Sequence, residues 1–467
     1  MWRLASSLRP GFWSAAGFAS VLLSVCLASS VVSAETPSAP NPGKLDIWVF
    51  AGQSNSQGWA LLKDPVGASP HIFALDENGQ WKIAREPLNP DFYRWTPLPV
   101  EPNILMQRHD LPLSGGRSPE EFVEEEKKEG IPLGGVGPGL MFAQRLHAVT
   151  RRDIGLIMCG VGSPIREWDP DAKPAGSHYA HMLTLIRKSG GRVKGLVWYQ
   201  GESDALTPGA AQRYQEALLA LFDGIRRDLH QANLPILCVQ AGRFAYPYRS
   251  EETSWETVRE AQRRATLERP RTYLISSIDL TMEDDIHVGF EGYRRLAPRI
   301  AETALSEVYG VPGHATPITF DSAQLIAPES WRPMIRVRFR GVSGRLQADG
   351  RPAGFEIRMP GPAEDPGAHY PAPPNPDVPL YSVYRVDFDP HDPSGVILGL
   401  FDASPILLGH RHPLCGPVSL IYAPGLNPYA NIHDGRDMAL PAFGPVPISL
   451  PPCAERASPD ASGRPSG

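Results

Sequence analysis

Short apolar runs alternate with helical patterns over the first two thirds of the chain. The apolar runs are bounded by Gly, Pro or polar residues and occupy 45–51, 154–159, 193–199, 235–240 and 272–278. Uninterrupted runs of this length are typical of strands that are buried on both faces. Between them, apolar residues recur every three or four positions, which predicts helices over 138–151, 181–188, 208–229, 256–267 and 293–308.

This alternation of strands and helices predicts a fold of the α/β class. Strands that alternate with helices form right-handed crossovers, which give a parallel sheet with helices on both faces. The stretch 61–137 breaks the alternation, because it holds many prolines and only weak periodicity. We interpret it as an elaborated loop region, with at most one short helix, over the mouth of the fold.

Beyond Pro312 the pattern changes to short runs with a period of two. In 334–341 the apolar residues Ile335, Val337 and Phe339 alternate with arginines, and similar runs lie at 384–388, 396–401 and 418–422. Turn residues separate these runs, so we expect a smaller all-β, sandwich-like second domain. The predicted domains are thus 45–312 and 313–452.

The two ends of the chain have distinct compositions. Residues 1–34 combine Arg3 and Arg9, an apolar stretch and the small residues Val-Ser-Ala, which is typical of a cleaved secretory signal peptide. We therefore expect a secreted or periplasmic protein without a membrane anchor after cleavage. Residues 453–467 hold Ser, Pro, Gly and Asp without an apolar period, which predicts a disordered tail.

Charge and cysteine content narrow the possible partners. The formal net charge is −6, which gives no attraction for nucleic acid or for an anionic membrane surface. Cys159 and Cys238 lie in strand-like runs, and we expect both to be buried free thiols. The sequence has no Cys-x-x-Cys motif and no His/Cys cluster with ligand spacing, so we expect neither a metal nor another cofactor.

Four polar motifs follow predicted strands at their carboxyl ends. They occupy 52–55, 160–168, 200–204 and 284–287. Open α/β sheets bind their ligands at this edge, and turns with a purely structural role have no need of so many Ser, His, Asp, Glu and Gln side chains. The sequence therefore predicts a functional site there.

The motifs supply a nucleophile, a base and a carboxylate. Ser54 follows a buried strand on a tight polar turn, which is a common position for a nucleophilic hydroxyl, although Ser54 could also simply cap a helix. His287 is the candidate base. Asp284, three residues earlier, can bind the imidazole Nδ1–H, and Asp285 is the alternative.

Other residues of the motifs are candidates for binding roles. The backbone N–H groups of Ser54 and Gly162 and the side-chain amide of Gln200 can form an oxyanion hole. Trp168 and Glu202 are candidate substrate-binding residues. Glu202 can also serve as a second catalytic carboxylate or orient a loop, and Trp168, like Trp59 and Tyr199, can equally be a packing residue.

The same motifs resemble those of a known family. Gly-Gln-Ser-Asn at 52–55, Gly-Ser-Pro-Ile-Arg-Glu-Trp at 162–168, Trp-Tyr-Gln-Gly-Glu-Ser at 198–203 and Asp284-x-x-His287 look like the successive blocks of SGNH-type esterases. They look most like the sialate O-acetylesterase and carbohydrate esterase family 6 branch. The resemblance covers about 45–311. It implies a flavodoxin-like three-layer fold and removal of acetyl groups from carbohydrates through an acyl-enzyme. Ser56 departs from the family, which often has Met there.

Two other functions remain open. An SGNH lipase or thioesterase would use the same nucleophile, base and carboxylate on a different ester. A carbohydrate-binding or cell-surface protein with an inactive hydrolase fold would need none of them, and the complete set of Ser, His and Asp residues argues against it.

Overall fold

The structure is a computed structural model. It describes residues 40–60, 66–88, 135–172, 176–245, 252–326, 332–358, 381–403, 414 and 418–450. The expected signal peptide, the expected C-terminal tail and most of the stretch 61–137 lie outside these residues. No helix within the described ranges combines the length and the apolar character that crossing a membrane requires.

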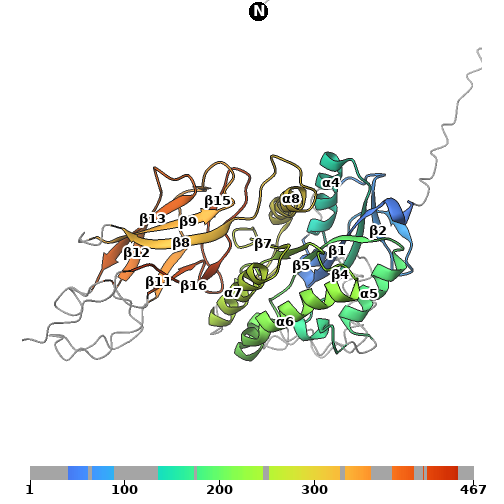
Figure 1. Cartoon of the computed structure of the whole chain (residues 1–467), viewed down its shortest axis with the longest axis horizontal. Helices are drawn as coiled ribbons and strands as arrows, with labels where there is room; N and C mark the ends of the chain where they lie inside the picture. Colours follow the sequence, from blue (N-terminus) through green and yellow to red (C-terminus); the bar gives the residue numbers. More distant parts are fainter. Residues whose placement is uncertain are drawn as a thin grey trace, which may run out of the picture. The chain divides into compact units, whose positions relative to one another are not determined.

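A seven-stranded sheet forms the centre of the N-terminal part (Figure 1). Its strands are β1 (Asp46–Gly52), β2 (Ile72–Leu75), β3 (Trp81–Ile83), β4 (Ile154–Gly160), β5 (Val193–Tyr199), β6 (Ile236–Val239) and β7 (Thr272–Ile275), in the spatial order β3-β2-β4-β1-β5-β6-β7. All neighbours are parallel except β3, which runs antiparallel to β2 at the edge. The expected mostly parallel α/β sheet is thereby confirmed.

The order of the strands identifies where a ligand site is expected. The five predicted strands lie in the order β4-β1-β5-β6-β7, which is the 2-1-3-4-5 order of flavodoxin-like doubly wound sheets. The chain leaves β1 toward β4 on one side and later returns to β5 on the other. In such sheets this switch point, at the carboxyl end of β1, opens a crevice for ligands.

Strands β2 and β3 were not predicted. We expected a loop region over 61–137, yet 72–75 and 81–83 extend the sheet beyond β4. Both strands are short, and β3 is only partly buried, so neither shows the long apolar run of a central strand. The tight turn between them is held by the Asp76 carboxylate, which accepts the backbone N–H groups of Asn78 and Gln80.

Helices cover both faces of the sheet (Figure 1). Side chains alternate along β1: Trp48 and Phe50 pack with α4 (Pro138–Thr150) and α8 (Phe290–Glu307). Ile47, Val49 and Ala51 pack on the other face, in the cluster that also holds residues of α5 (His178–Lys188), α6 (Pro208–Asp228) and α7 (Glu252–Glu268). Because β1 is buried on both sides, it fixes the position of the turn that follows it.

Antiparallel sheets make up the C-terminal part. Four strands are arranged as β12-β13-β9-β8, three as β11-β14-β16 and two as β10-β15. Their bounds are β8 (Thr319–Ile326), β9 (Met334–Arg340), β10 (Gln347–Ala348), β11 (Phe355–Arg358), β12 (Tyr381–Phe388), β13 (Gly395–Asp402), β14 (Ser419–Tyr422), β15 (Ile432–His433) and β16 (Phe443–Pro447). We call residues 315–450 the C-terminal β region. Most of its buried apolar side chains, including Ile335, Val337 and Phe339, form one hydrophobic cluster together with Ile278, whereas Leu426 belongs to a cluster of the parallel sheet.

The two thiols behave as expected. Cys159 on β4 and Cys238 on β6 are buried and free. Burial raises the pKa of both thiols, because it disfavours the charged thiolate. They are packing residues of the sheet.

Candidate active site

The polar motifs meet at the carboxyl end of the sheet. Gly52 at the end of β1 pairs with Gly160 at the end of β4 and with Tyr199 at the end of β5. Ser54, Gly162 and Gln200 each lie one or two residues beyond these paired positions. Asp284 and His287 lie between β7 and α8. The structure thus brings together segments separated by more than 230 residues.

The turn after β1 depends on a glycine. Gly52 has a φ of +132°, and a Cβ at this position would lie 2.0 Å from the Tyr199 carbonyl oxygen. Only glycine fits so close to the backbone of β5. The chain then turns sharply into the one-turn helix α1 (Ser54–Gln57), in which the Ser56 N–H and hydroxyl both donate to the Gln53 carbonyl. Ser54 begins this helix, so its N–H has no partner within the helix.

Ser54, His287 and Asp284 form a continuous chain of hydrogen bonds. The Ser54 Oγ lies 2.9 Å from His287 Nε2, and His287 Nδ1 lies 2.6 Å from Asp284 Oδ2. Asp284 Oδ1 also accepts the N–H groups of Ile286 and His287, at 2.9 and 2.7 Å. With Nδ1 donating to the carboxylate, Nε2 is free to take a proton from the serine.

The environment keeps Asp284 ionised. Burial by itself raises the pKa of Asp284, but the hydrogen bond and charge of His287 and the two backbone N–H groups lower it below its usual value. The neighbouring Asp285 makes a different contact: its backbone carbonyl accepts the Ala245 N–H at 2.7 Å. Of the two carboxylates, the geometry places that of Asp284 against the imidazole.

Asn55 and Gln53 connect the motifs, a role that the sequence analysis did not assign. Asn55 Nδ2 donates to Glu202 Oε1 and to the Ile286 carbonyl, and Asn55 Oδ1 accepts the Val288 N–H at 3.0 Å. Gln53 Oε1 accepts the N–H groups of Gly201 and Ser203. Their place in the Gly-Gln-Ser-Asn motif could have indicated this role, because polar side chains beside the turn of a nucleophile can bind the neighbouring loops.

Trp59 stacks on the imidazole of His287. The two ring centroids are 4.8 Å apart, and the planes differ by 22°. Trp59 is half-buried and covers one face of the ring. This contact limits the motion of the base and the access of water to one face of the ring.

Gln200 does not present its amide to Ser54. Its side chain is fully buried, and Nε2 donates to Asp204 Oδ2 at 2.6 Å and to the Ser163 carbonyl at 3.3 Å. Both amide hydrogens are therefore used elsewhere, which corrects the expectation that Gln200 contributes to the oxyanion hole. Its role here is to join the ends of β4 and β5.

Trp168 and Glu202 are also buried rather than available to a substrate. Trp168 is 0% exposed, packs edge-on against Trp198 and donates Nε1–H to Ser163 Oγ. Glu202 is 3% exposed and accepts from Asn55. Burial raises the pKa of Glu202 despite this hydrogen bond. The expectation that these two side chains bind substrate is corrected: both support the loops that carry the site.

Gly162 remains a candidate oxyanion donor. The residue follows β4, whose end is paired with that of β1, and a Cβ at Gly162 would meet no atom within 4 Å. Space is therefore available over its backbone. The backbone N–H groups of Ser54 and Gly162 thus remain the two candidate oxyanion donors.

One group of possible metal ligands lies elsewhere. His71, His147 and Asp153 have potential ligand atoms within 4.8 Å of one another, and this is the only such group in the part of the chain that the structure describes. His71 precedes β2 and Asp153 precedes β4, so the group lies at the amino ends of the strands, opposite Ser54. It has no part in the site.

The chain is similar to known proteins in sequence and in fold. The chain is 33% identical over 296 residues to a probable carbohydrate esterase of Arabidopsis thaliana, covering 58% of this chain and 93% of that protein. Its fold is similar to that of a carbohydrate acetylesterase from Xanthomonas citri, with a TM-score of 0.57, 21% identity and coverage of 85% of this chain and 80% of the other. The latter likeness concerns the fold alone.

A family model matches more than half of the chain. It spans residues 44–306, which include the parallel sheet and all four polar motifs. The model is described as carbohydrate esterase, sialic acid-specific acetylesterase. The chain therefore belongs to this family of carbohydrate esterases.

Proposed function

We propose that this protein removes O-acetyl groups from carbohydrates by a serine esterase mechanism with an acyl-enzyme intermediate. The observation that carries the proposal is the hydrogen-bonded chain from Ser54 through His287 to Asp284, with donor–acceptor distances of 2.9 and 2.6 Å. Membership of the carbohydrate esterase family supports an acetylated carbohydrate as the substrate.

In the first half of the reaction, Ser54 Oγ attacks the carbonyl carbon of the acetyl ester while His287 Nε2 takes the hydroxyl proton. Asp284 stabilises the imidazolium that forms. The N–H groups of Ser54 and Gly162 stabilise the negative charge on the carbonyl oxygen. The tetrahedral intermediate then expels the sugar oxygen, which receives the proton from His287, and the acetyl group remains on Ser54.

In the second half, water replaces the sugar. His287, again neutral, removes a proton from the water as its oxygen attacks the acetyl carbon. Collapse of the second tetrahedral intermediate returns the proton to Ser54 Oγ and releases acetate. Trp59 shields one face of the imidazole in both halves.

We further propose that residues 45–312 form the catalytic domain and 313–452 a β domain. The hydrophobic cluster of the C-terminal β region supports this division. Secretion or export to a periplasm, with removal of residues 1–34, is likewise a proposal based on sequence. Mass spectrometry of the mature protein tests it: an N-terminus near Glu35 is expected, and a retained apolar stretch at 12–27 would contradict it.

Acetate release tests the proposed activity. Wild-type protein is incubated with acetylated xylan, acetylated pectin and O-acetylated sialosides, and acetate is measured for each, with Ser54→Ala as the control. We expect release from at least one of these carbohydrates by the wild type alone. Nitrophenyl esters of increasing acyl length are measured in parallel, and the acetyl ester is expected to give the highest kcat/KM.

The alternatives predict different results. A lipase or thioesterase prefers longer acyl chains and leaves the acetylated carbohydrates intact. A carbohydrate-binding protein with an inactive site hydrolyses none of the esters. Either pattern would contradict the proposed function.

A further inference from the structure

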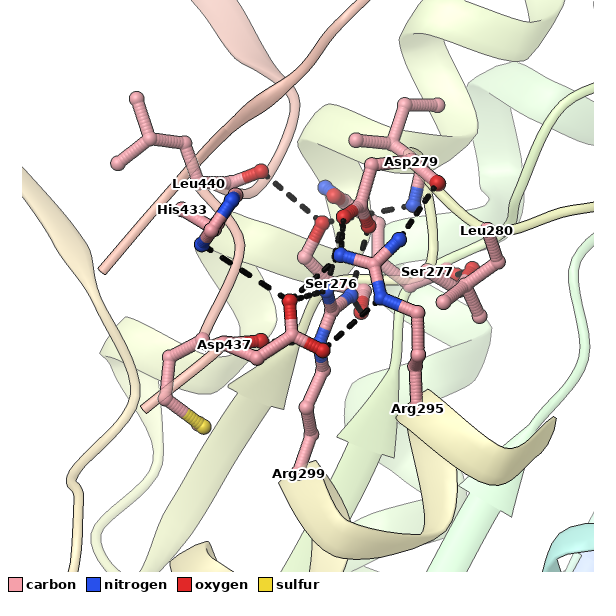
Figure 2. Close-up of polar contacts among 12 residues, drawn as sticks. Ser276, Ser277, Asp279, Leu280, Arg295, Arg299, His433, Asp437 and Leu440 are labelled. Atoms are coloured by element: carbon pink, nitrogen blue, oxygen red, sulfur yellow. Dashed lines mark hydrogen bonds and ion pairs between the residues drawn. The ribbon is translucent and has the colours of Figure 1, made fainter. Parts of the chain in front are cut away.

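Two arginines of α8 and two aspartates form a polar cluster between the parallel sheet and the C-terminal β region (Figure 2). The members are Asp279, Arg295, Arg299 and Asp437, and we call them the Arg–Asp cluster. The Arg299 side chain is 1% exposed and that of Asp279 is 6% exposed. The cluster holds two positive and two negative charges, so its formal charges balance.

Asp279 and α8 delimit the segment that carries His287. Residues 280–289, here named the His287 loop, connect the segment after β7 with the start of α8. The Asp279 carboxylate accepts two hydrogen bonds from Arg299, at 2.6 and 2.8 Å, and one from Arg295 at 2.8 Å, and the Asp279 carbonyl accepts another from Arg295 at 3.2 Å. These bonds join the beginning of the loop to the helix at its end, so they close the loop at its base.

Asp437 completes the cluster from the C-terminal β region. Its Oδ2 accepts Arg295 Nε at 2.9 Å, and its Oδ1 accepts Arg295 Nη2 at 2.5 Å and Arg299 Nη2 at 3.0 Å. The Asp437 carbonyl accepts Arg299 Nε as well. Asp437 lies in a turn with a φ of 58°, which is unusual for a residue other than glycine. One carboxylate thus orients both guanidinium groups that hold Asp279.

The arginines of the cluster keep both of its carboxylates ionised. Burial by itself raises the pKa of Asp437, but its contacts with Arg295 and Arg299 lower it below its usual value. Burial also raises the pKa of Asp279, but the charges of Arg299 and Arg295 outweigh it, so this pKa too lies below its usual value. Bidentate arginine–carboxylate pairs combine charge with a fixed geometry, which suits a positioning role.

Two polar contacts join the His287 loop to the segment after β6. Arg243 Nη2 donates to the Leu280 carbonyl, and Ala245 N–H donates to the Asp285 carbonyl, each at 2.7 Å. Inside the loop, Glu283 N–H donates to the His287 carbonyl and Gly289 N–H to the Thr281 carbonyl. The loop is therefore a small closed unit. It is held at its base by the Arg–Asp cluster and beside Ser54 by Asn55, which binds the Ile286 carbonyl and the Val288 N–H.

We propose that Asp437 is a positioning residue for the esterase reaction: through Arg295 and Arg299 it holds the His287 loop so that His287 Nε2 remains within reach of Ser54 Oγ. The inference rests on the proposed function. It makes the C-terminal β region part of the catalytic apparatus rather than an independent attachment. The proposed oxyanion donors lie on other loops, after β1 and β4, so loss of Asp437 displaces the base and not the acetyl-binding groups.

Three variants test the proposal. Asp437→Asn removes one charge of the cluster with little change in shape. Arg295→Lys is milder, because it retains the positive charge but removes the two-pronged contact, and Arg295 is 32% exposed. Asp392→Asn is the matched control, since Asp392 pairs with the half-exposed Arg338 of the same β region, outside the Arg–Asp cluster. The unfolding midpoint of each protein is first determined by thermal unfolding. kcat and KM are then measured for each at a temperature well below all these midpoints.

We expect Asp437→Asn and Arg295→Lys to lower kcat by about 10- to 100-fold at nearly unchanged KM, because small displacements of a catalytic group have effects of this size. His287 and Asp284 lie on the same loop, so we expect the far-downfield NMR signal of the proton between them to persist in both variants, which separates a displaced loop from a broken His287–Asp284 pair. Asp392→Asn is expected to match the wild type in both measurements.

Wild-type kcat in folded Arg295→Lys and Asp437→Asn would overturn the proposal. If Asp437→Asn does not fold, the result for Arg295→Lys decides. Ser54→Ala, measured in the same series, separates this outcome from failure of the proposed function. An active Ser54→Ala protein refutes the mechanism itself, whereas an inactive one beside a fully active Arg295→Lys refutes only the role of the cluster.

Discussion

The Asn55 side-chain oxygen accepts the backbone N–H of Val288 at 3.0 Å, across 233 positions of sequence. This bond joins the residue after Ser54 to the residue after His287. The Tyr293 hydroxyl of α8 donates to the same region, to the backbone oxygen and the side chain of Asn55, at 3.2 Å each. Nucleophile and base are therefore held together by their neighbours, so the Ser54–His287 bond does not have to hold them alone.

Asp284→Asn should lower kcat by about 10⁴-fold, as loss of the carboxylate does in serine triads. An asparagine in this position leaves the imidazole free to adopt the tautomer in which Nε2 carries the proton. The same substitution at Asp285 should have little effect, because only the backbone carbonyl of Asp285 has a described hydrogen bond. Both variants are assayed with one acetyl ester across pH.

The pH profile adds a check. The base must be neutral to accept the serine proton, so wild-type activity should rise from acid pH and then level off. If Asp285→Asn is the inactive variant, the orienting carboxylate is assigned one position too early. If both variants remain active, no carboxylate on this loop orients the base.

The core of the fold could be predicted from sequence, because its strands are buried on both faces. The runs at 45–51 and 193–199 match β1 and β5 within one residue at each end. Strands β2, β3 and β8 were missed, since each mixes polar and apolar residues and is only partly buried. Strands at or next to the edge of a sheet owe their structure to the neighbour with which they pair, and that neighbour is not visible in the local pattern.

The site could be predicted only as far as residue type indicates chemistry. Ser54, Asp284 and His287 stood out because a hydroxyl, a carboxylate and an imidazole after strand ends suggest a reaction. Burial, however, decided against Gln200, Trp168 and Glu202, and burial depends on packing among distant segments. The motif Gly-Gln-Ser-Asn marked Asn55 as a residue of the site, but its partners Glu202 and Ile286 depend on the same packing and could not be predicted.

Trp59→Ala should lower kcat by between about 2- and 12-fold. Aromatic pairs of this kind contribute about 0.5–1.5 kcal/mol, and here the contact restrains the His287 ring. Trp59→Phe retains a stacking face and should lie close to the wild type. Steady-state kinetics of the two variants measure the difference. Equal activity of Trp59→Ala and the wild type would show that the stack does not contribute to orienting the base.

Gly162→Ala should impair the reaction without destabilising the protein. The added methyl group meets no protein atom within 4 Å, so the midpoint of thermal unfolding should not change. If the acetyl carbonyl binds over this residue, the methyl group displaces it, and kcat/KM should fall by about 10²-fold. A variant with normal kcat/KM would place the oxyanion hole elsewhere. A strongly lowered unfolding midpoint would mean that the effect is structural.

Asp279→Asn should lower the free energy of unfolding by about 1.5–3 kcal/mol at pH 7, because the buried Arg299 loses one of its two carboxylate partners and retains only Asp437. Asp321, which pairs with the exposed Arg340, is the control: Asp321→Asn should change the stability by no more than about 0.5 kcal/mol. Denaturant unfolding of the three proteins gives these values.

The difference between wild type and Asp279→Asn should depend on pH. The folded-state pKa of Asp279 is lowered by Arg299 and Arg295 against the opposing effect of burial. Its contribution to stability is therefore complete above the unfolded pKa of about 3.9 and is lost as the pH falls through the folded pKa. The difference in the free energy of unfolding between the two proteins should therefore become smaller below about pH 4. A difference that becomes larger below this pH would contradict an ionised Asp279 paired with Arg299 and Arg295.

The central claim is that Ser54 is the nucleophile activated by His287, and stoichiometric labelling tests it most directly. Wild-type protein is treated with a nitrophenyl phosphonate, which transfers its phosphorus group to an activated serine, and the intact mass and peptide masses are measured. We predict one label per chain, on the peptide that contains Ser54, with loss of esterase activity in proportion to labelling. Ser54→Ala should not be labelled, and His287→Ala should be labelled far more slowly. A label on another serine, or full esterase activity without a label on Ser54, would contradict the account.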